Sequence, residues 1–117
     1  KTNGVAVAFF GDGAFNQGTT LESMNFASVY NLPVFFVLED NGYAETTSSR
    51  WSIGGHNPVR RAEGFGIPGE RVDGHDFFAV YEAAGEAICM CQSSPPALAP
   101  GSKHTISSTC PTTSQSV

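Results

Sequence analysis

The fold is decided by residues 5–42, VAVAFFGDGAFNQGTTLESMNFASVYNLPVFFVLEDNG. Residues 5–10 and 34–38 are short apolar runs, typical of strands that are buried on both faces of a parallel sheet. The intervening residues predict a helix of about 13 residues, which Pro33 ends because proline lacks a backbone donor. Strand, helix and strand form a βαβ unit, whose right-handed crossover brings both strand ends to one edge of the sheet.

The start of this helix carries a recognisable signal. Thr19 and Glu22 have the spacing of a capping box, in which a hydroxyl and a carboxylate satisfy backbone N–H groups of the first turn. We therefore expect the helix to begin at Thr19. Downstream, residues 43–57 lack strand alternation and are rich in Thr, Ser and Gly, so we expect a loop there. A hairpin turn at residues 41–42 (NG) is the alternative interpretation.

The remaining elements are shorter, apart from one helix. We expect a short helix over residues 60–66, a brief strand around residues 71–72, and a turn at residues 73–76 with Asp76 as the N-cap of the next helix. Apolar residues from Phe77 to Cys91 recur at three- and four-residue steps. This spacing predicts an amphipathic helix with one packed face. The fold class that follows is α/β, a three-layer module around a parallel sheet.

Composition narrows the classes of function. The chain has 117 residues and a formal net charge of −5, which argues against a nucleic-acid or anionic-membrane surface. No apolar run reaches the roughly 20 residues that span a bilayer. Three cysteines, an odd number, favour a reducing compartment over a disulfide framework.

Composition also changes abruptly along the chain. All acidic and aromatic residues lie within residues 1–91, whereas residues 92–117 are rich in Ser, Thr and Pro, with Lys103 as the one charged residue. We interpret residues 1–91 as a partial domain and residues 92–117 as a disordered or irregular low-complexity tail. The abruptness motivates the hypothesis of a frameshift or cloning artefact near residues 89–92.

The chemistry is predicted to lie where the two strands end. Gly11 and Gly13 flank Asp12, and glycines let backbone N–H groups approach an anionic ligand ahead of a helix N-terminus. Asp12 would repel a phosphate unless a divalent cation lies between them, and Mg²⁺ commonly bridges carboxylates to phosphates. Asn41 follows the neighbouring strand and offers an amide oxygen, and the backbone carbonyl of Tyr43 offers another.

Three other interpretations of residues 11–18 are an ordinary turn, a P-loop and a Rossmann dinucleotide site. Residues 11–13 (GDG) are also an ordinary turn, which the residues alone leave open. A P-loop is excluded because no Gly-Lys-Ser/Thr follows. A Rossmann site is disfavoured because Gly18 comes two residues late for the G-x-G-x-x-G spacing, and Asp12 would face the pyrophosphate.

Several motifs now carry a family resemblance. They are residues 11–18 (GDGAFNQG), Glu22, Asn25, residues 32–33 (LP) and residues 39–44 (EDNGYA). With these motifs the chain resembles the α-subunit of thiamine-diphosphate-dependent 2-oxo-acid (pyruvate-type) and acetoin dehydrogenases. The likeness continues through residues 67–69 (IPG) and 72–76 (VDGHD) towards Cys91, about 90 residues in all.

The resemblance implies a set of binding residues within a partial thiamine-diphosphate-binding fold. By this likeness Asp12, the Asn41 side chain and the Tyr43 carbonyl bind Mg²⁺, while Gly13 and Ala14 present N–H groups to the diphosphate of thiamine diphosphate. The family usually has Asn-Asn where this chain has Asp40 and Asn41. The second position is the ligand, so metal binding is retained, with an extra negative charge beside it.

The resemblance also implies an enzyme and its partners. Such subunits act in oxidative decarboxylation or acetoin cleavage, form heterotetramers with a β-subunit, and pass the acyl group to a lipoyl acyltransferase. Location in the bacterial cytoplasm, or in the mitochondrial matrix of a eukaryote, follows from the same likeness. No catalytic residue is assigned to this chain, and the substrate (pyruvate, a branched 2-oxo acid or acetoin) stays open. A truncated, non-catalytic or regulatory binding module of the same fold is the alternative function.

Other candidate residues have simpler explanations. His75 is explained by the turn that leads to Asp76. Cys89 and Cys91 point to different faces of a helix, which favours packing over metal binding. Arg60 and Arg61 are expected to face solvent, although the resemblance places this region near the entrance of the active site.

Overall fold

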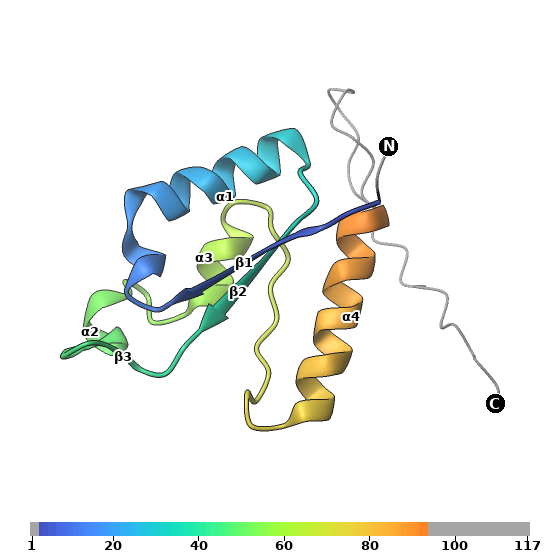
Figure 1. The fold of residues 1–117 in the computed structure, drawn as a ribbon. Coiled ribbons are helices and arrows are strands. Elements are labelled where there is room, and N and C mark those ends of the chain that lie inside the picture. Colours follow the sequence, from blue (N-terminus) through green and yellow to red (C-terminus); the bar gives the residue numbers. More distant parts are fainter. Residues whose placement is uncertain (1–2, 94–117) are drawn as a thin grey trace.

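The structure is a computed structural model that describes residues 3–93 (Figure 1). Strands β1 (Ala6–Gly11) and β2 (Val34–Glu39) run parallel and pair along their whole length. They are joined by the 3-10 helix η1 (Ala14–Asn16) and the helix α1 (Gly18–Tyr30). The predicted βαβ unit is therefore confirmed, and both strands end at the same edge.

Helix α1 begins earlier than the capping box predicted. Its N-cap is Gln17, an extended residue that makes no side-chain capping bond, so the Thr19 start is wrong. The preceding η1 turn leads directly into the helix, and Thr20 Oγ1 donates to the Ala14 carbonyl at 2.8 Å. At the other end Asn31 adopts the left-handed conformation (φ 45°) two residues before Pro33, which matches the predicted stop.

A small hairpin replaces the expected loop after β2. Strands β3 (Tyr43–Ala44) and β4 (Thr47–Ser48) pair antiparallel. The turn is not at Asn41–Gly42 as the alternative proposed; it includes Glu45, whose φ is 55°. The short helix α2 (Ser49–Ser52) follows at once. The loop prediction is therefore wrong for this segment, because too few residues pair for strand alternation to show in the sequence.

Helix α3 (Pro58–Glu63) also differs from its predicted bounds of residues 60–66. Asn57 is its N-cap, and the Asn57 Oδ1 atom accepts a hydrogen bond from the Arg60 backbone N–H at 3.2 Å. Proline at the first helical position is favourable, so the helix starts there and ends at Gly64. The strand expected around residues 71–72 does not form, because within the described chain neither β1 nor β2 pairs with this segment.

Helix α4 (Phe77–Ser93) is the longest element and packs against β2. Its predicted N-cap is confirmed, since Asp76 Oδ1 accepts hydrogen bonds from the N–H groups of Phe78 (3.0 Å) and Ala79 (3.1 Å). Near its C-terminal end Cys91 Sγ approaches the Val34 carbonyl oxygen at 3.5 Å, and burial raises the pKa of this thiol. No α4 residue is fully buried, so the predicted packed face is only half covered.

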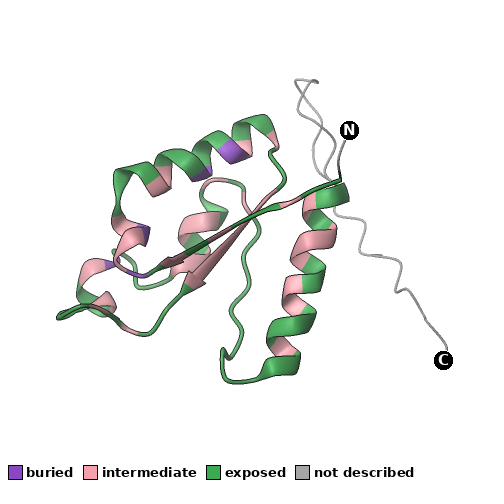
Figure 2. Ribbon diagram, in the orientation of Figure 1, coloured by how far each residue is buried: buried purple, intermediate pink, exposed green. Residues whose placement is uncertain are grey.

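The core lies between the strands and α1. Phe15, Met24 and Ile53 are its buried members; Phe10, Phe36, Leu38, Phe65 and Ile67 pack against them. Figure 2 shows the buried positions on η1 and α1, whereas α4 has none. In Figure 1, α1 and α4 lie on opposite sides of the strand pair. The described residues thus form an α/β arrangement of parallel strands and helices.

One part of the fold prediction fails at β1. Phe9 is 69% exposed and Val7 is also exposed, so β1 is not buried on both faces by the described residues. The exposed Val7 and Phe9 alternate with the half-buried Ala8 and Phe10, so the described residues leave one face of β1 uncovered, while α4 packs against β2. Among residues 3–93 no helix is long and apolar enough to cross a membrane. The predicted boundary at residues 91–92 falls near the end of α4, and residues 94–117 of the tail lie outside the described residues.

Candidate functional site

The loop after β1 holds a buried carboxylate. Asp12 is 2% exposed, although an ionised carboxylate is rarely buried without partners. Its Oδ1 atom accepts a hydrogen bond from the Gly13 N–H at 3.0 Å, whereas its Oδ2 atom is buried with no hydrogen-bond partner. A buried, unpartnered oxygen of this kind needs an explanation, and a bound cation is a common one.

Gly13 brings the loop after β1 against the hairpin. A Cβ atom added at Gly13 would lie 2.6 Å from Ala44 Cβ, which is closer than real side chains allow. The φ of Gly13 is −66°, so the glycine is required for this close approach and not for a left-handed backbone. The contact places the loop of Asp12 beside β3, in the segment that follows Asn41.

The second strand end presents its polar groups differently. Asn41 is exposed, and its Oδ1 atom accepts a hydrogen bond from the Tyr43 N–H at 3.1 Å. Asp40 is exposed too, and its Oδ1 atom accepts from the Gly42 N–H at 3.3 Å. Both side chains therefore fold back onto their own turn.

An open pocket of about 630 Å³ lies on this side of the site. It is lined by Asp40, Asn41, Gly42, Tyr43, Ser48, Ser49, Arg50, Ile53, His56, Pro58 and Arg71. Asn41 and Tyr43 thus share one surface, but Asp12 does not line it. The structure brings the two loops into contact through Gly13 and Ala44, without bringing Asp12 into the pocket that Asn41 faces.

Metal-binding clusters of the usual kind are absent from the described part of the chain. Among residues 3–93 no three His, Cys, Asp or Glu side chains are placed to hold an ion. An ion bound by the predicted set would therefore depend on one carboxylate, Asp12, together with an amide oxygen and a backbone carbonyl oxygen. Oxygen ligands of this type suit Mg²⁺, which also keeps several waters.

Arg61 differs from the sequence-based expectation that it faces solvent, because it contacts η1. Its side chain is half-buried, and its Cζ atom lies 4.8 Å from the centre of the Phe15 ring. Its Nη1 atom donates to Asn16 Oδ1 at 2.9 Å and approaches the Phe15 carbonyl oxygen at 3.5 Å. Arg60 is exposed as predicted. The sequence signal that could have indicated this is the helix start at Asn57 and Pro58, because the first residue of α3 determines which face of the helix each later side chain occupies.

The weaker candidates behave as ordinary structure. The His75 N–H donates to Asp73 Oδ1 at 3.0 Å within the predicted turn, and the side chain is exposed. Cys91 is a free thiol, half-buried against Val34, which fits packing. Cys89 is instead disulfide-bonded, so the expectation that the cysteines are reduced is wrong for this residue. None of these residues lies among those that line the pocket beside Asn41.

Comparison with known families identifies the chain. The family model described as "Dehydrogenase E1 component" matches residues 1–98. The chain belongs to this family. The predicted resemblance is therefore confirmed at the level of the family, and the βαβ unit, the Asp12 loop and α4 all fall within the match.

Individual relatives agree with the family. Over 84 residues the chain is 63% identical to the α-subunit of acetoin:2,6-dichlorophenolindophenol oxidoreductase of Cupriavidus necator. This alignment covers 72% of the present chain and 25% of the relative. It is 46% identical over 89 residues to the pyruvate dehydrogenase E1 α-subunit of Rhizobium meliloti, an alignment that covers 76% of this chain and 26% of the relative. It is 44% identical over 93 residues to the mitochondrial α-subunit of Dictyostelium discoideum pyruvate dehydrogenase (80% and 24%). The chain spans about a quarter of the length of these relatives.

Proposed function

We propose that this chain anchors magnesium and thiamine diphosphate within the α-subunit of a 2-oxo-acid or acetoin dehydrogenase. The observation that carries the proposal is the buried, unpartnered Oδ2 atom of Asp12, at the end of β1. A divalent cation supplies the missing partner for this oxygen. Membership of the E1 family supports the same cofactor, because dehydrogenase E1 components depend on thiamine diphosphate.

The donor atoms of the two loops are of the kind that magnesium and a diphosphate bind, and binding would bring Asp12 and Asn41, which do not line one pocket here, onto the same ion. Asp12 Oδ2, Asn41 Oδ1 and the Tyr43 carbonyl oxygen would hold Mg²⁺, and Asp40 would add negative charge beside them. The N–H groups of Gly13 and Ala14 would donate to the diphosphate; the Gly13 N–H now donates to Asp12 Oδ1 and would change partner. The close contact between Gly13 and Ala44 supports this assignment, since any side chain at residue 13 would separate the loops.

The division of chemistry follows from these assignments. When bound, thiamine diphosphate supplies a nucleophilic thiazolium carbon that adds to a carbonyl carbon of the substrate. The residues of this chain hold the diphosphate and its metal, and none of them is assigned a proton-transfer role. We further propose that a β-subunit completes the active site and that a lipoyl acyltransferase receives the acyl group. The names of the α-subunit relatives support a second subunit.

This division of labour also bears on activity and location. The 117-residue chain is expected to be inactive on its own, because the proton-transfer groups are proposed to lie elsewhere. We propose the cytoplasm for a bacterial source and the mitochondrial matrix for a eukaryotic one; a mitochondrial relative supports the second location. Turnover of pyruvate or acetoin by the purified chain would contradict the proposed role as an anchoring module.

Calorimetric titration of the 117-residue chain with thiamine diphosphate tests the anchoring role. We expect binding in Mg²⁺ that disappears in EDTA. Asp12→Asn keeps the shape of the side chain and the acceptor for Gly13 but removes the charge. Loss of an outer-shell partner lowers metal affinity by about 10- to 100-fold, so loss of the ligand itself should lower it at least as far.

Asp76→Asn is the matched control, because Asp76 is an exposed N-cap away from the site and asparagine also caps helices well. The control should bind thiamine diphosphate as the unsubstituted chain does. Binding that is equal in Mg²⁺ and EDTA, or equal in Asp12→Asn and the unsubstituted chain, would contradict the proposal.

A further inference from the structure

The guanidinium of Arg61 contacts the loop between Asp12 and α1 from a distant part of the chain. It belongs to α3, stacks on the ring of Phe15 and donates to Asn16 Oδ1 at 2.9 Å. Forty-five residues separate Arg61 from Asn16 in the sequence. Phe15 is 1% exposed, so the guanidinium rests on a ring that the core holds in place. A stacked arginine with a directed hydrogen bond is geometrically demanding.

The Asn16 side-chain amide links Arg61 to the backbone of Asp12 through two hydrogen bonds. A guanidinium has only donors, so the Asn16 atom that faces Arg61 must be the carbonyl oxygen. The amide Nδ2 atom then faces the Asp12 backbone and donates to its carbonyl oxygen at 3.4 Å. Arg61 therefore sets the orientation of the Asn16 side chain, and Asn16 in turn contacts the backbone of Asp12.

The charge of Arg61 is directed at neutral oxygens. Its recorded acceptors are Asn16 Oδ1 and the Phe15 carbonyl oxygen, and within residues 3–93 no carboxylate forms an ion pair with it. Its contact with the site is thus not an exchangeable surface ion pair, which would contribute little. Asn57 and Pro58 fix the start of α3, and the Arg61 N–H donates to the Asn57 carbonyl at 3.3 Å, so the backbone of Arg61 is held as well.

We propose that Arg61 is a positioning residue for the site, which holds residues 12–16 in the conformation that binds magnesium and diphosphate without itself touching either ligand. This inference rests on the proposed function of the loop. The loop is held by β1 before it and by α1 after it, and Arg61 adds a third fixed point from α3. Without the Arg61 contact, the loop samples conformations that do not bind magnesium and diphosphate. The apparent affinity then falls in proportion to the fraction of molecules whose loop is in the binding conformation.

The test measures the affinity of the 117-residue chain for thiamine diphosphate by calorimetry, in Mg²⁺ and in EDTA. Arg61→Leu keeps an apolar stem against Phe15 but removes every donor, and we expect binding in Mg²⁺ to weaken about tenfold, as for loss of a charge-assisted hydrogen bond. Arg61→Lys retains the charge and an ammonium donor but loses the planar guanidinium, and it should recover part of the affinity. Arg60→Leu is the matched control, because Arg60 is exposed on the same helix, and it should stay within about twofold of the unsubstituted chain.

A double-variant cycle separates positioning from a general loss of stability. If Arg61 acts through Asn16, then Arg61→Leu combined with Asn16→Ala should bind about as weakly as either single variant. Losses that multiply in the double variant would overturn the inference. Urea unfolding of each variant shows how much of the chain is folded under the titration conditions, and affinities are compared for the folded fraction.

The remaining outcomes are also decisive. If Arg61→Leu does not fold, the affinities of Arg61→Lys and Asn16→Ala are measured instead. If both variants bind thiamine diphosphate as tightly as Arg60→Leu does, the inference is overturned. Folded Arg61→Leu that binds as Arg60→Leu does would overturn it too, while leaving the proposed function intact. Absence of Mg²⁺-dependent binding in the unsubstituted chain would instead remove the proposed function and this inference with it.

Discussion

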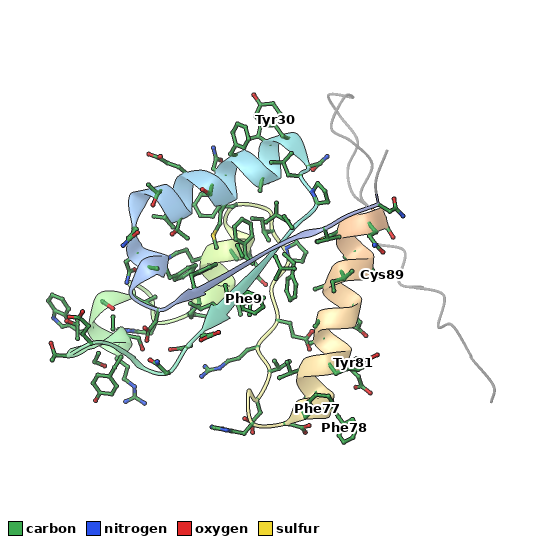
Figure 3. The ribbon with its side chains drawn as sticks, in the orientation of Figure 1. Phe9, Tyr30, Phe77, Phe78, Tyr81 and Cys89 are labelled. Atoms are coloured by element: carbon green, nitrogen blue, oxygen red, sulfur yellow. The ribbon has the colours of Figure 1, made fainter. Side chains whose placement is uncertain are left out.

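Two aromatic clusters in this molecule are packed very differently. In the core beside the candidate site, Phe10 stacks on Phe15 with ring centres 6.1 Å apart and meets Phe36 edge-on at 6.3 Å. At the start of α4, Phe77 contacts Phe78 at 5.5 Å and Tyr81 at 6.3 Å. Figure 3 shows this second group gathered at the beginning of α4. Its three members are 70–74% exposed, whereas Phe15 is almost completely buried.

The difference lies in where the rings come from. The cluster beside the site joins three separate elements, β1, η1 and β2, so its rings hold those elements together. The α4 cluster consists of residues of one helix at steps of one and four, so its contacts are local. Aromatic content alone therefore does not indicate a core. A core forms where aromatic side chains from distant segments pack together, and in this chain that packing is next to Asp12.

This convergence explains how polar groups are held at the site. Phe15 is buried between Asp12 and Asn16 in the sequence, so the core fixes the backbone of the loop that carries them. The Arg61 guanidinium lies over the same ring. A packed core and a positioned polar loop are thus one structure here, whereas α4 combines a satisfied N-cap with little burial.

Truncation of one ring from each cluster gives the largest contrast. Phe15→Ala removes a buried ring and should lower the free energy of unfolding by about 3–5 kcal/mol. Phe77→Ala removes a ring that is 72% exposed and should change it by no more than about 0.5 kcal/mol. Urea unfolding of the 117-residue chain, followed by circular dichroism, measures both values. Equal losses in the two variants would show that the α4 cluster is as much a core as the one beside the site.

Crowding at Gly13 gives a smaller effect with a built-in rescue. Gly13→Ala introduces a Cβ atom 2.6 Å from Ala44 Cβ, and relief of this overlap should cost about 1–3 kcal/mol of unfolding free energy. Ala44→Gly in the same chain removes the opposing atom and should recover most of the loss. Gly11→Ala is the control, since a Cβ there meets nothing within 4 Å. Urea unfolding of the three variants and the unsubstituted chain measures these differences. Failure of the double variant to recover stability would mean that the two loops are not in contact as described.

Much of the framework could be predicted because it is encoded in local patterns. The two apolar runs, the helix between them and Pro33 identified the βαβ unit, and the Asp76 cap and the apolar spacing identified α4. The topology then placed the loops of Asp12 and Asn41 at one edge of the sheet without any knowledge of contacts. These are statements about backbone direction, which short-range signals determine well.

One error is local: the hydroxyl spacing at Thr19 is outweighed by the extended Gln17 that links η1 to α1. The other errors share a physical cause, which is dependence on distant partners. The strand expected at residues 71–72 needs a neighbour that the described residues do not supply. The approach of Gly13 to Ala44 and the contact of Arg61 with Asn16 both join segments more than 25 residues apart. No periodicity reports such contacts.

Removal of the Asp76 cap should produce the smallest of the three effects on stability, and it tests the α4 side of the comparison. The Asp76 Oδ1 atom accepts two backbone N–H groups of the first turn, so Asp76→Ala should cost about 1 kcal/mol of unfolding free energy. Asp76→Asn keeps an acceptor at the same position and should lose less than half as much. Urea unfolding with circular dichroism measures both. If the two variants lose equally, the negative charge near the helix N-terminus matters more than the hydrogen bonds, because asparagine retains only the latter. If Asp76→Ala costs as much as Phe15→Ala, then α4 is coupled to the whole core despite its exposed rings, and the contrast between the two clusters does not describe how stability is distributed.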